Sequence, residues 1–147
     1  MATVFSKIIE GEIPGRFVWR DDRAVVFLTI APITPGHLLV VPIEEVDHWI
    51  DLDPDLAAHL MRVAREVGRA QVQVFEPRRI GVIIAGLEVP HCHLHLVPIN
   101  VEAELSFSRA DHAPDPTALD DAAERLRDAL RELGHGDRVD AAVTPTR

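Results

Sequence analysis

The sequence contains a single cysteine, Cys92, in 147 residues, so no disulfide can form within the chain. Basic residues are also few, since 15 Lys and Arg stand against 24 Asp and Glu, which gives a net charge of −9. This balance argues against a nucleic-acid partner, because contacts to a phosphate backbone need clustered cations. It leaves open a small phosphate ligand held in one local pocket.

Long hydrophobic runs are absent as well. The N-terminus, MATVFSKIIEGEIPG, lacks the basic segment and apolar run of a signal peptide. No apolar segment approaches the roughly 20 residues that cross a membrane, so we expect no membrane partner. A lone cysteine fits a reducing compartment. We therefore expect a soluble, cytoplasmic protein, whose 47% hydrophobic content suits one domain with a proper core.

Residue periodicity predicts the element order α-β-β-β-α-β-β in the first hundred residues. The clearest helix begins after Asp53, a good N-cap, with Pro54 at its first position. Its apolar face consists of Leu56, Leu60, Val63, Val67, Ala70 and Val74. Strands are predicted at 16–20, 24–30, 37–43, 80–86 and 91–99, with the fourth buried on both faces. The fold class is α+β, a five-stranded antiparallel sheet with one main helix and a C-terminal helix.

The C-terminal third has a different character. We predict a domain over residues 1–100 and a C-terminal extension over 101–147. Residues 99–116 show no period and are expected to form a loop, whereas 117–134 carry one amphipathic helix with Leu119, Leu126 and Leu130 on its apolar face. This helix is expected to pack on the domain or on a dimer partner, the segment from Val101 onward to cover the partner or border the active site, and the last dozen residues to fray.

The segment HCHLHLVPIN, residues 91–100, places a histidine at every second position. Successive side chains of a strand leave from opposite faces, so His91, His93 and His95 should share one face, with neighbours roughly 6.5–7 Å apart. Cys92 should point into the core. Three titratable rings in a row on an otherwise apolar strand need an explanation.

Three interpretations of these rings are open. They can be structural histidines with satisfied hydrogen bonds. Alternating histidines on a strand can also supply two or three zinc ligands. The third interpretation is catalysis at a phosphate, because neutral imidazole is a nucleophile near pH 7 and a neighbouring ring can donate a proton. In that case the middle ring attacks phosphorus while the other two hold and orient it.

Two motifs together carry a resemblance to a known family. His91-Cys92-His93-Leu94-His95-Leu96-Val97 fits the pattern His-φ-His-φ-His-φ-φ, where φ is apolar, and PGHLLVVP places His37 at the start of another strand. Over about residues 4–98 the sequence resembles the histidine triad (HIT) superfamily. It looks closest to the Hint-like and general bacterial branch, and further from the galactose-1-phosphate uridylyltransferase branch.

The resemblance implies a fold, an activity and roles for four histidines. His93 would be the nucleophile that forms a transient nucleotidyl-histidine, which water then hydrolyses. His95 would contact the scissile phosphate and the leaving group, and His91 and His37 would orient the nucleophile by hydrogen bonds. It also implies a homodimer in which two sheets join, and no metal cofactor for this step.

The sequence departs from the family pattern at the positions that bind nucleotide. Thr29 stands where the family has an aspartate that binds the ribose hydroxyls. Leu87 and Glu88 stand where a glutamine and a small hydroxyl residue contact the phosphate. Leu87 cannot donate a side-chain hydrogen bond, and Glu88 would repel a phosphate that it faced. These departures put the substrate in question more than the chemistry.

Several other residues carry expectations that the structure can test. Some relatives hold a structural zinc with an N-terminal Cys-x-x-Cys; here that region is Val4-Phe5-Ser6-Lys7 and Glu45 replaces a later histidine, so we expect no metal site. Trp19 and Trp49 are expected in the core or a dimer interface. The remaining histidines are expected on the solvated surface: His48, His59, His112 and His135.

Two functions from different classes follow. The first is a nucleotide hydrolase that acts on the P–N or phosphoanhydride bond of a nucleoside monophosphate derivative through His93. The alternative is a non-catalytic nucleotide-binding or regulatory homologue whose ligand pocket has changed at Thr29, Leu87 and Glu88. A histidine metal site is the third possibility.

Overall fold

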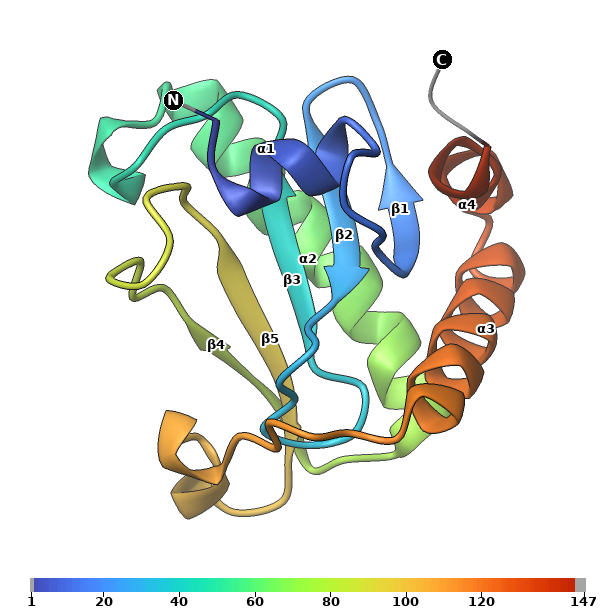
Figure 1. The fold of residues 1–147 in the computed structure, drawn as a ribbon. Helices are drawn as coiled ribbons and strands as arrows, with labels where there is room; N and C mark the ends of the chain where they lie inside the picture. Colours follow the sequence, from blue (N-terminus) through green and yellow to red (C-terminus); the bar gives the residue numbers. More distant parts are fainter. Residues whose placement is uncertain (1, 145–147) are drawn as a thin grey trace.

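The computed structural model describes residues 2–144, and its elements are arranged around one sheet (Figure 1). The helices and strands are α1 (Val4–Ile9), β1 (Phe17–Arg20), β2 (Ala24–Leu28), β3 (Leu38–Pro42), α2 (Pro54–Phe75), β4 (Arg79–Ile83), β5 (Leu94–Ile99), α3 (Pro116–Glu132) and α4 (Gly136–Val143). Short 3-10 turns lie at Trp49–Asp51, Glu102–Glu104 and Phe107–Arg109.

The five strands form an antiparallel sheet in the order β1-β2-β3-β5-β4. The α+β class and the element order over the first hundred residues are therefore confirmed. Because β5 inserts between β3 and β4, Leu39 of β3 lies opposite His95 of β5. This register brings His37, which directly precedes β3, to the histidine-rich strand.

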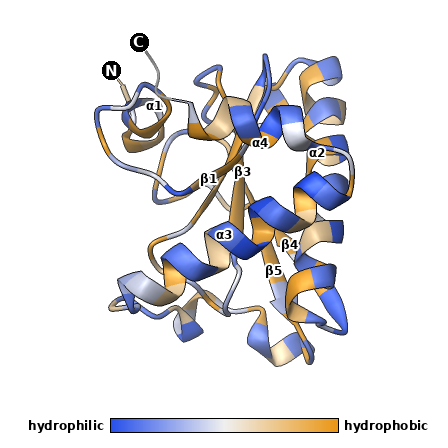
Figure 2. Cartoon of the chain, turned by 90° about the vertical axis from the view of Figure 1, so that its right-hand side faces the viewer, coloured by the Kyte–Doolittle hydropathy of each residue, from blue (hydrophilic) through white to orange (hydrophobic). Residues whose placement is uncertain are grey.

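Helices cover both faces of the sheet. Val25 and Phe27 of β2 pack in a cluster with Phe5 and Ile9 of α1. The alternate residues of β2 face the larger core, which contains residues of α2, α3 and α4. Both faces of β2 and β3 are therefore buried. In Figure 2, β3 is almost uniformly hydrophobic, whereas α2 and α3 alternate hydrophobic and hydrophilic positions.

The main helix starts as the sequence predicts. The carboxylate of Asp53 accepts a hydrogen bond from the N–H of Leu56 at 3.2 Å, and Pro54 occupies the first turn. Leu56, Leu60 and Val67 are buried in the core. The helix ends at Phe75, followed by Glu76 with a positive φ of 49°.

Two strand predictions need correction. Strand β4 is not buried on both faces, because it is the edge strand of the sheet and its residues are exposed or half-buried. Strand β5 begins at Leu94 rather than at residue 91, so His91 and His93 lie in the segment that leads into the strand. His95 is the one member of the trio within it.

The C-terminal helices pack on their own chain. Leu119, Leu126 and Leu130 are buried, and α3 contacts α2 and β1. Fraying of the last dozen residues is wrong for 136–143, since α4 packs on β1 with Val139 fully buried. The apolar pattern of this helix, with Val139 and Ala142 as its buried residues, is too short to predict a helix from the sequence. Residues 145–147 of the expected frayed end lie outside the described residues. The division into a domain over residues 1–100 and an extension over 101–147 stays a prediction.

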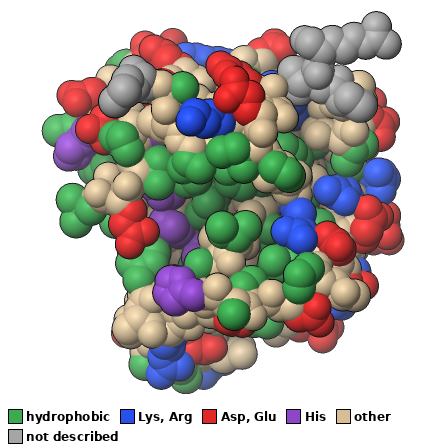
Figure 3. Space-filling model, viewed as in Figure 1, with side chains coloured by type: hydrophobic (Ala, Val, Ile, Leu, Met, Phe, Trp, Pro, Cys, Tyr) green, Lys and Arg blue, Asp and Glu red, His purple; other side chains and the backbone are tan. Residues whose placement is uncertain are grey.

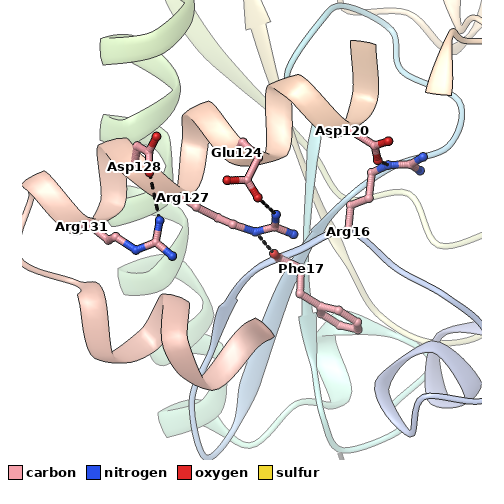
Figure 4. A network of polar contacts seen from close by, with 7 residues as sticks. All are labelled: Arg16, Phe17, Asp120, Glu124, Arg127, Asp128 and Arg131. Carbon is pink, nitrogen blue, oxygen red and sulfur yellow. Dashed lines mark hydrogen bonds and ion pairs between the residues drawn. The ribbon is translucent and has the colours of Figure 1, made fainter. Parts of the chain in front are cut away.

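Polar contacts attach α3 to the first strand (Figure 4). Arg127 donates from Nε to the carbonyl oxygen of Phe17 at 2.8 Å, and Arg16 pairs with Asp120 at 2.7 Å. Arg127 also pairs with Glu124. Because exposed ion pairs contribute at most about 1 kcal/mol, the buried leucines provide most of the attachment.

Gly36 of the PGH motif allows the sheet and α2 to approach each other closely. Its φ is +86°, and a Cβ there would lie 2.2 Å from the ring of Phe75. Gly36→Ala should lower the free energy of unfolding by roughly 1–3 kcal/mol more than Gly11→Ala. Gly11 is a matched control, because it has the same φ and a Cβ there would have no atom of the described residues within 4 Å. Urea denaturation of both variants measures the difference, and equal losses would contradict a role for the Phe75 contact.

Candidate active site

Three imidazoles stand in a row across the ends of β3 and β5. The ring centroids of His93 and His95 are 4.8 Å apart, and those of His95 and His37 are 5.1 Å apart. His37 is 1% exposed, His93 is 6% exposed and His95 is half-buried. On the face shown in Figure 3, histidine side chains lie in a hollow beside a band of hydrophobic side chains.

Hydrogen bonds to backbone groups and between the rings determine which nitrogen of each ring carries the proton. The N–H of Ile33 donates to Nδ1 of His37 at 3.0 Å, so the neutral His37 ring carries its proton on Nε2. That Nε2–H donates to Nδ1 of His95 at 2.9 Å. His95 must therefore carry its own proton on Nε2, where it can donate to a ligand.

The His93 ring has the opposite tautomer. Its Nδ1 lies 2.7 Å from the carbonyl oxygen of His91, and a carbonyl can only accept, so Nδ1 carries the proton. The lone pair of neutral His93 is consequently on Nε2. This tautomer is the one that a nucleophilic imidazole needs.

His91 occupies a separate, fully buried place. It donates from Nε2 to the carbonyl oxygen of Pro42 at 2.7 Å and accepts at Nδ1 from the Thr3 hydroxyl at 2.9 Å. Thr3 and Ser6 of the N-terminal turn both donate to Oε1 of Glu45, at 2.9 and 2.8 Å. The His91 contact with His93 is thus made by the backbone carbonyl, and the hydrogen bond of His37 goes to His95 rather than to His93.

Two phenylalanines cover the row of rings. Phe5 of α1 meets His93 edge to face, with centroids 4.8 Å apart, and Phe107 meets His95 in the same way at 4.9 Å. Phe107 comes from the loop after β5, so part of the segment from Val101 onward borders the candidate site. No sequence periodicity identifies either contact.

Burial keeps these rings neutral. Desolvation, with a smaller effect of neighbouring His93, lowers the pKa of His37 to about 4. Desolvation and the nearby rings of His93 and His37 lower the pKa of His95 to about 3. The pKa of His93 is also lowered, mainly by burial, although its bond to the His91 carbonyl and the charge of Glu88 oppose this. At neutral pH the Nε2 of His93 is therefore unprotonated.

A depression of about 320 Å³ adjoins His93. It lies between two loops, and its lining residues are Asp47, His48, Trp49, Ile84, Ala85, Gly86, Leu87, Pro90, Cys92 and His93. Trp49, expected in the core or an interface, is 48% exposed and lines this depression, whereas Trp19 is buried as predicted. The only sequence signal for the exposed position of Trp49 was that it is an aromatic residue in the polar stretch DHWID.

The nucleotide-binding positions named from the sequence lie at different places around the row. Thr29 follows β2 and donates its N–H to the carbonyl oxygen of His37 at 3.3 Å, so it stands at the His37 end. Leu87, 96% exposed, lines the depression at the His93 end. Glu88 is exposed in the same loop, and its charge acts on His93.

The other histidines divide into two groups. His48 and His112 are exposed, as expected. His59 and His135 are not simply solvated, which corrects the prediction: Nε2 of His59 lies 2.8 Å from Asp21, and Nε2 of His135 lies 2.9 Å from Glu66. Their carboxylate partners are 38 and 69 residues away in the chain, so local sequence cannot reveal them.

Cys92 packs in the core, as predicted, and burial raises the pKa of its thiol to about 11. Within residues 2–144, no three His, Cys, Asp or Glu side chains converge in a metal-binding arrangement. Over the same residues, no helix is long and apolar enough to cross a membrane.

A mixed sheet-and-helix fold with this row of imidazoles defines the class of histidine triad proteins. The HIT domain model matches residues 10–101, and the chain belongs to this family. An uncharacterised HIT-like protein of Borreliella burgdorferi is 32% identical over 115 residues, covering 74% of this chain and 83% of the relative.

Solved structures agree with this assignment. A zinc-bound histidine triad family protein from Mycobacterium smegmatis has a TM-score of 0.79 and 28% identity, and the match covers 92% of this chain and 98% of that one. A Hit-like protein from Bartonella henselae, described as involved in cell-cycle regulation, has a TM-score of 0.74 and 27% identity over 86% and 95% of the two chains.

The lowered pKa values of His37 and His95 predict acid sensitivity. Both rings bind a proton more readily in the unfolded chain, where their pKa is about 6.5, than in the folded one, where it is about 4 and about 3. The stabilising contribution of these two neutral rings to the free energy of unfolding should be fully present above pH 6.5. It should fall between pH 6.5 and 5 by up to about 1.4 kcal/mol per pH unit for each ring.

Urea denaturation across this pH range measures the slope. His37→Gln removes one of the two titrating rings and should flatten it, whereas His112→Gln, in an exposed loop, should leave it unchanged. A wild-type protein whose stability is constant from pH 6.5 to 5 would contradict the neutral, buried row.

Proposed function

We propose that this chain is a nucleotide hydrolase that cleaves a P–N or phosphoanhydride bond of a nucleoside 5′-monophosphate derivative. The observation that supports it most is the tautomer of His93, whose Nδ1–H is held by the His91 carbonyl so that the Nε2 lone pair is free. The neighbouring His95 ring, whose centroid lies 4.8 Å from that of His93, carries an N–H donor on Nε2. This pair suits attack on phosphorus beside a donor to the phosphoryl oxygens.

The reaction has two steps. Nε2 of His93 attacks the α-phosphorus and forms a nucleotidyl-histidine, while Nε2–H of His95 donates a hydrogen bond to the phosphoryl group. The bond from phosphorus to the leaving nitrogen or oxygen breaks in the same step, and the leaving group departs with the electron pair and, where it is an amine, takes a proton from solvent water. Water then attacks the same phosphorus and releases the nucleoside monophosphate. The positioning roles fall to His91, through its carbonyl oxygen, and to His37, which orients His95. No metal takes part in this proposal.

Backbone groups compensate for the altered nucleotide-binding side chains. Within residues 2–144, the N–H groups of Leu87 and Glu88 donate to no protein acceptor, so they are available to phosphate oxygens whatever the side chains are. The Thr29 hydroxyl accepts from the N–H of Ala31 at 3.1 Å and keeps its own proton for a ribose hydroxyl. We therefore assign these three positions to nucleotide binding.

The rival function is a nucleotide-binding or regulatory homologue without catalysis. Two residues favour this alternative. Thr29 replaces a carboxylate that binds the ribose, and Glu88 adds a negative charge near the phosphate. It predicts binding of monophosphates without turnover. A cytoplasmic location stays a prediction of the sequence.

Incubation with adenosine 5′-phosphoramidate tests the enzyme directly. The wild type should release AMP, and His93→Ala should lose roughly a thousandfold or more of kcat, because it removes the nucleophile. His112→Ala is the matched control. Acid quenching of the wild type during turnover should trap a protein with the mass of one added AMP. Equal rates for wild type and His93→Ala would exclude this mechanism.

We also propose that two chains form a homodimer through α2 and the edge strand β4. Among residues 2–144 no strand lies along the outer edge of β4, and such edges pair readily with a second chain. Met61 and Val72 of α2 and Val82 of β4 are 54%, 48% and 43% exposed. They line a largely apolar depression of about 510 Å³, which a second copy would cover.

Sedimentation equilibrium measures this association. The wild type should have twice the 16.3 kDa mass of one chain, and Val82→Lys should shift it to the monomer by placing a charge on the pairing edge. Val143→Lys, at a similarly exposed valine of α4, should remain dimeric. A monomeric wild type at micromolar concentration would refute the dimer.

A further inference from the structure

An amide of the main helix lies between the two backbone segments that carry His37 and His95. Gln71 of α2 is fully buried, on a helix face whose other buried residues are apolar or glycine. Its Nε2 donates to the carbonyl oxygen of Gly36 and to that of Leu96, both at 2.9 Å. Gly36 directly precedes His37 in the chain. Leu96 directly follows His95, so the amide joins the backbone beside one ring to the backbone beside the other.

This amide bridge lies where the pairing of β3 with β5 stops. The last residue pair between the two strands at this end is Leu38–Leu96. Gly36 lies two residues before β3, in the turn that leads into it. A primary amide carries two N–H groups on one nitrogen, so a single side chain can satisfy two carbonyl oxygens that would otherwise face each other without a donor. Gln71 thus extends the link between the strands to the level of the imidazoles.

The two acceptors also determine how the amide is oriented. An oxygen in the place of Nε2 would face two other carbonyl oxygens, so the NH2 group must occupy this position. Within residues 2–144, Oε1 of Gln71 is buried and has no hydrogen-bond partner. A buried, unpaired carbonyl disfavours the folded state. The hydrogen bonds of the Gln71 side chain are therefore the two that it donates to the backbone beside the rings.

A second contact holds the same turn against α2. Phe75 follows Gln71 by four residues, so both side chains lie on one face of the helix. A Cβ at Gly36 would lie 2.2 Å from the Phe75 ring, which shows how closely the turn approaches the helix. The ring limits this approach by contact, and the amide directs it by hydrogen bonds.

Resting on the proposed function, we propose that Gln71 is a positioning residue for the hydrolysis. It touches neither ring, since Leu96 belongs to the core that contains α2 and the preceding His95 leaves β5 from the opposite face. By holding the two backbone carbonyls, it sets the separation of His37 and His95. The 2.9 Å hydrogen bond from Nε2 of His37 to Nδ1 of His95 depends on that separation.

The His37–His95 hydrogen bond matters because it determines the tautomer of His95. A lengthening of about 0.6 Å would bring it to the roughly 3.5 Å at which a hydrogen bond is lost. Without a donor at Nδ1, a neutral His95 ring can carry its proton on either nitrogen. In one of the two tautomers Nε2 is then an acceptor, which cannot donate to the phosphoryl group.

Gln71→Met tests this role, because it keeps the length of the side chain and removes both N–H donors. With adenosine 5′-phosphoramidate it should lower kcat roughly tenfold and change KM less than twofold, since part of the protein then lacks the His95 donor in the transition state. Val67→Ala is the matched control. Val67 is fully buried on the same helix face one turn earlier, so this variant loses core packing and should keep the wild-type kcat.

Nitrogen-15 NMR of the histidine rings in the free protein measures the tautomer without any substrate. At pH 7.5 the wild type should show His95 with its proton on Nε2 alone. Gln71→Met should show a mixture of the two tautomers, with His93 unchanged because its own bond goes to the His91 carbonyl. A role in stability alone would leave the tautomer of His95 unchanged, as we expect for Val67→Ala.

A second variant covers the case in which Gln71→Met does not fold. Gln71→Glu keeps the shape of the side chain and has one O–H donor when its carboxyl group is protonated, which burial favours by raising the pKa. The fraction of His95 with its proton on Nε2 should therefore rise in this variant from pH 8 to pH 6, whereas it should stay constant in the wild type.

The outcomes distinguish the two proposals. A folded Gln71→Met with wild-type kcat, or with an unchanged His95 tautomer, would overturn the positioning role and leave the hydrolase in place. A pH-independent wild-type tautomer in Gln71→Glu would overturn it as well. If the wild type releases no AMP but Gln71→Met mixes the tautomers, the proposed function fails and the control of the ring pair by Gln71 stands.

Discussion

The hydrogen bond from Nδ1 of His93 to the carbonyl oxygen of His91, 2.7 Å long, decides which nitrogen of the central ring has a lone pair. A backbone carbonyl cannot donate, so the tautomer does not depend on solvent or on the ligand. The position of that carbonyl depends in turn on the buried His91 ring, which the Pro42 carbonyl and the Thr3 hydroxyl hold from both sides. The N-terminal turn and β3 thereby hold the His91 carbonyl that determines the tautomer of His93.

The neutral state of the row follows from the same packing. Phe5, Phe107 and the sheet remove water from the rings, and an imidazole without water or an anion loses its preference for the charged form. The Ile33 N–H adds a directional constraint, because it makes His37 a donor to His95 rather than an acceptor. Burial thus keeps the rings neutral, and hydrogen bonds to the backbone determine which ring nitrogens donate and which accept.

Much of the fold could be predicted because its causes are local. The N-cap Asp53, the apolar face of α2 and the alternation in HCHLHLV are all readable within a few residues. The failures share a different cause. The exposure of β4, the docking of α4 on β1, and the partners of His59 and His135 depend on which distant segment lies alongside. Trp49 belongs with them, since a loop 35 residues and more away forms the other wall of its depression.

By itself the sequence determined the histidines and their two-residue spacing, the PGH motif that places His37 before another strand, and the family to which the chain belongs. Only the tertiary structure decided which ring donates, which accepts and which keeps a free lone pair. Proton placement on an imidazole depends on the atom that each nitrogen meets at about 3 Å, and those atoms belong to Ile33, His91 and Thr3. Spacing along a strand contains no information about such partners, because the fold brings them from other segments.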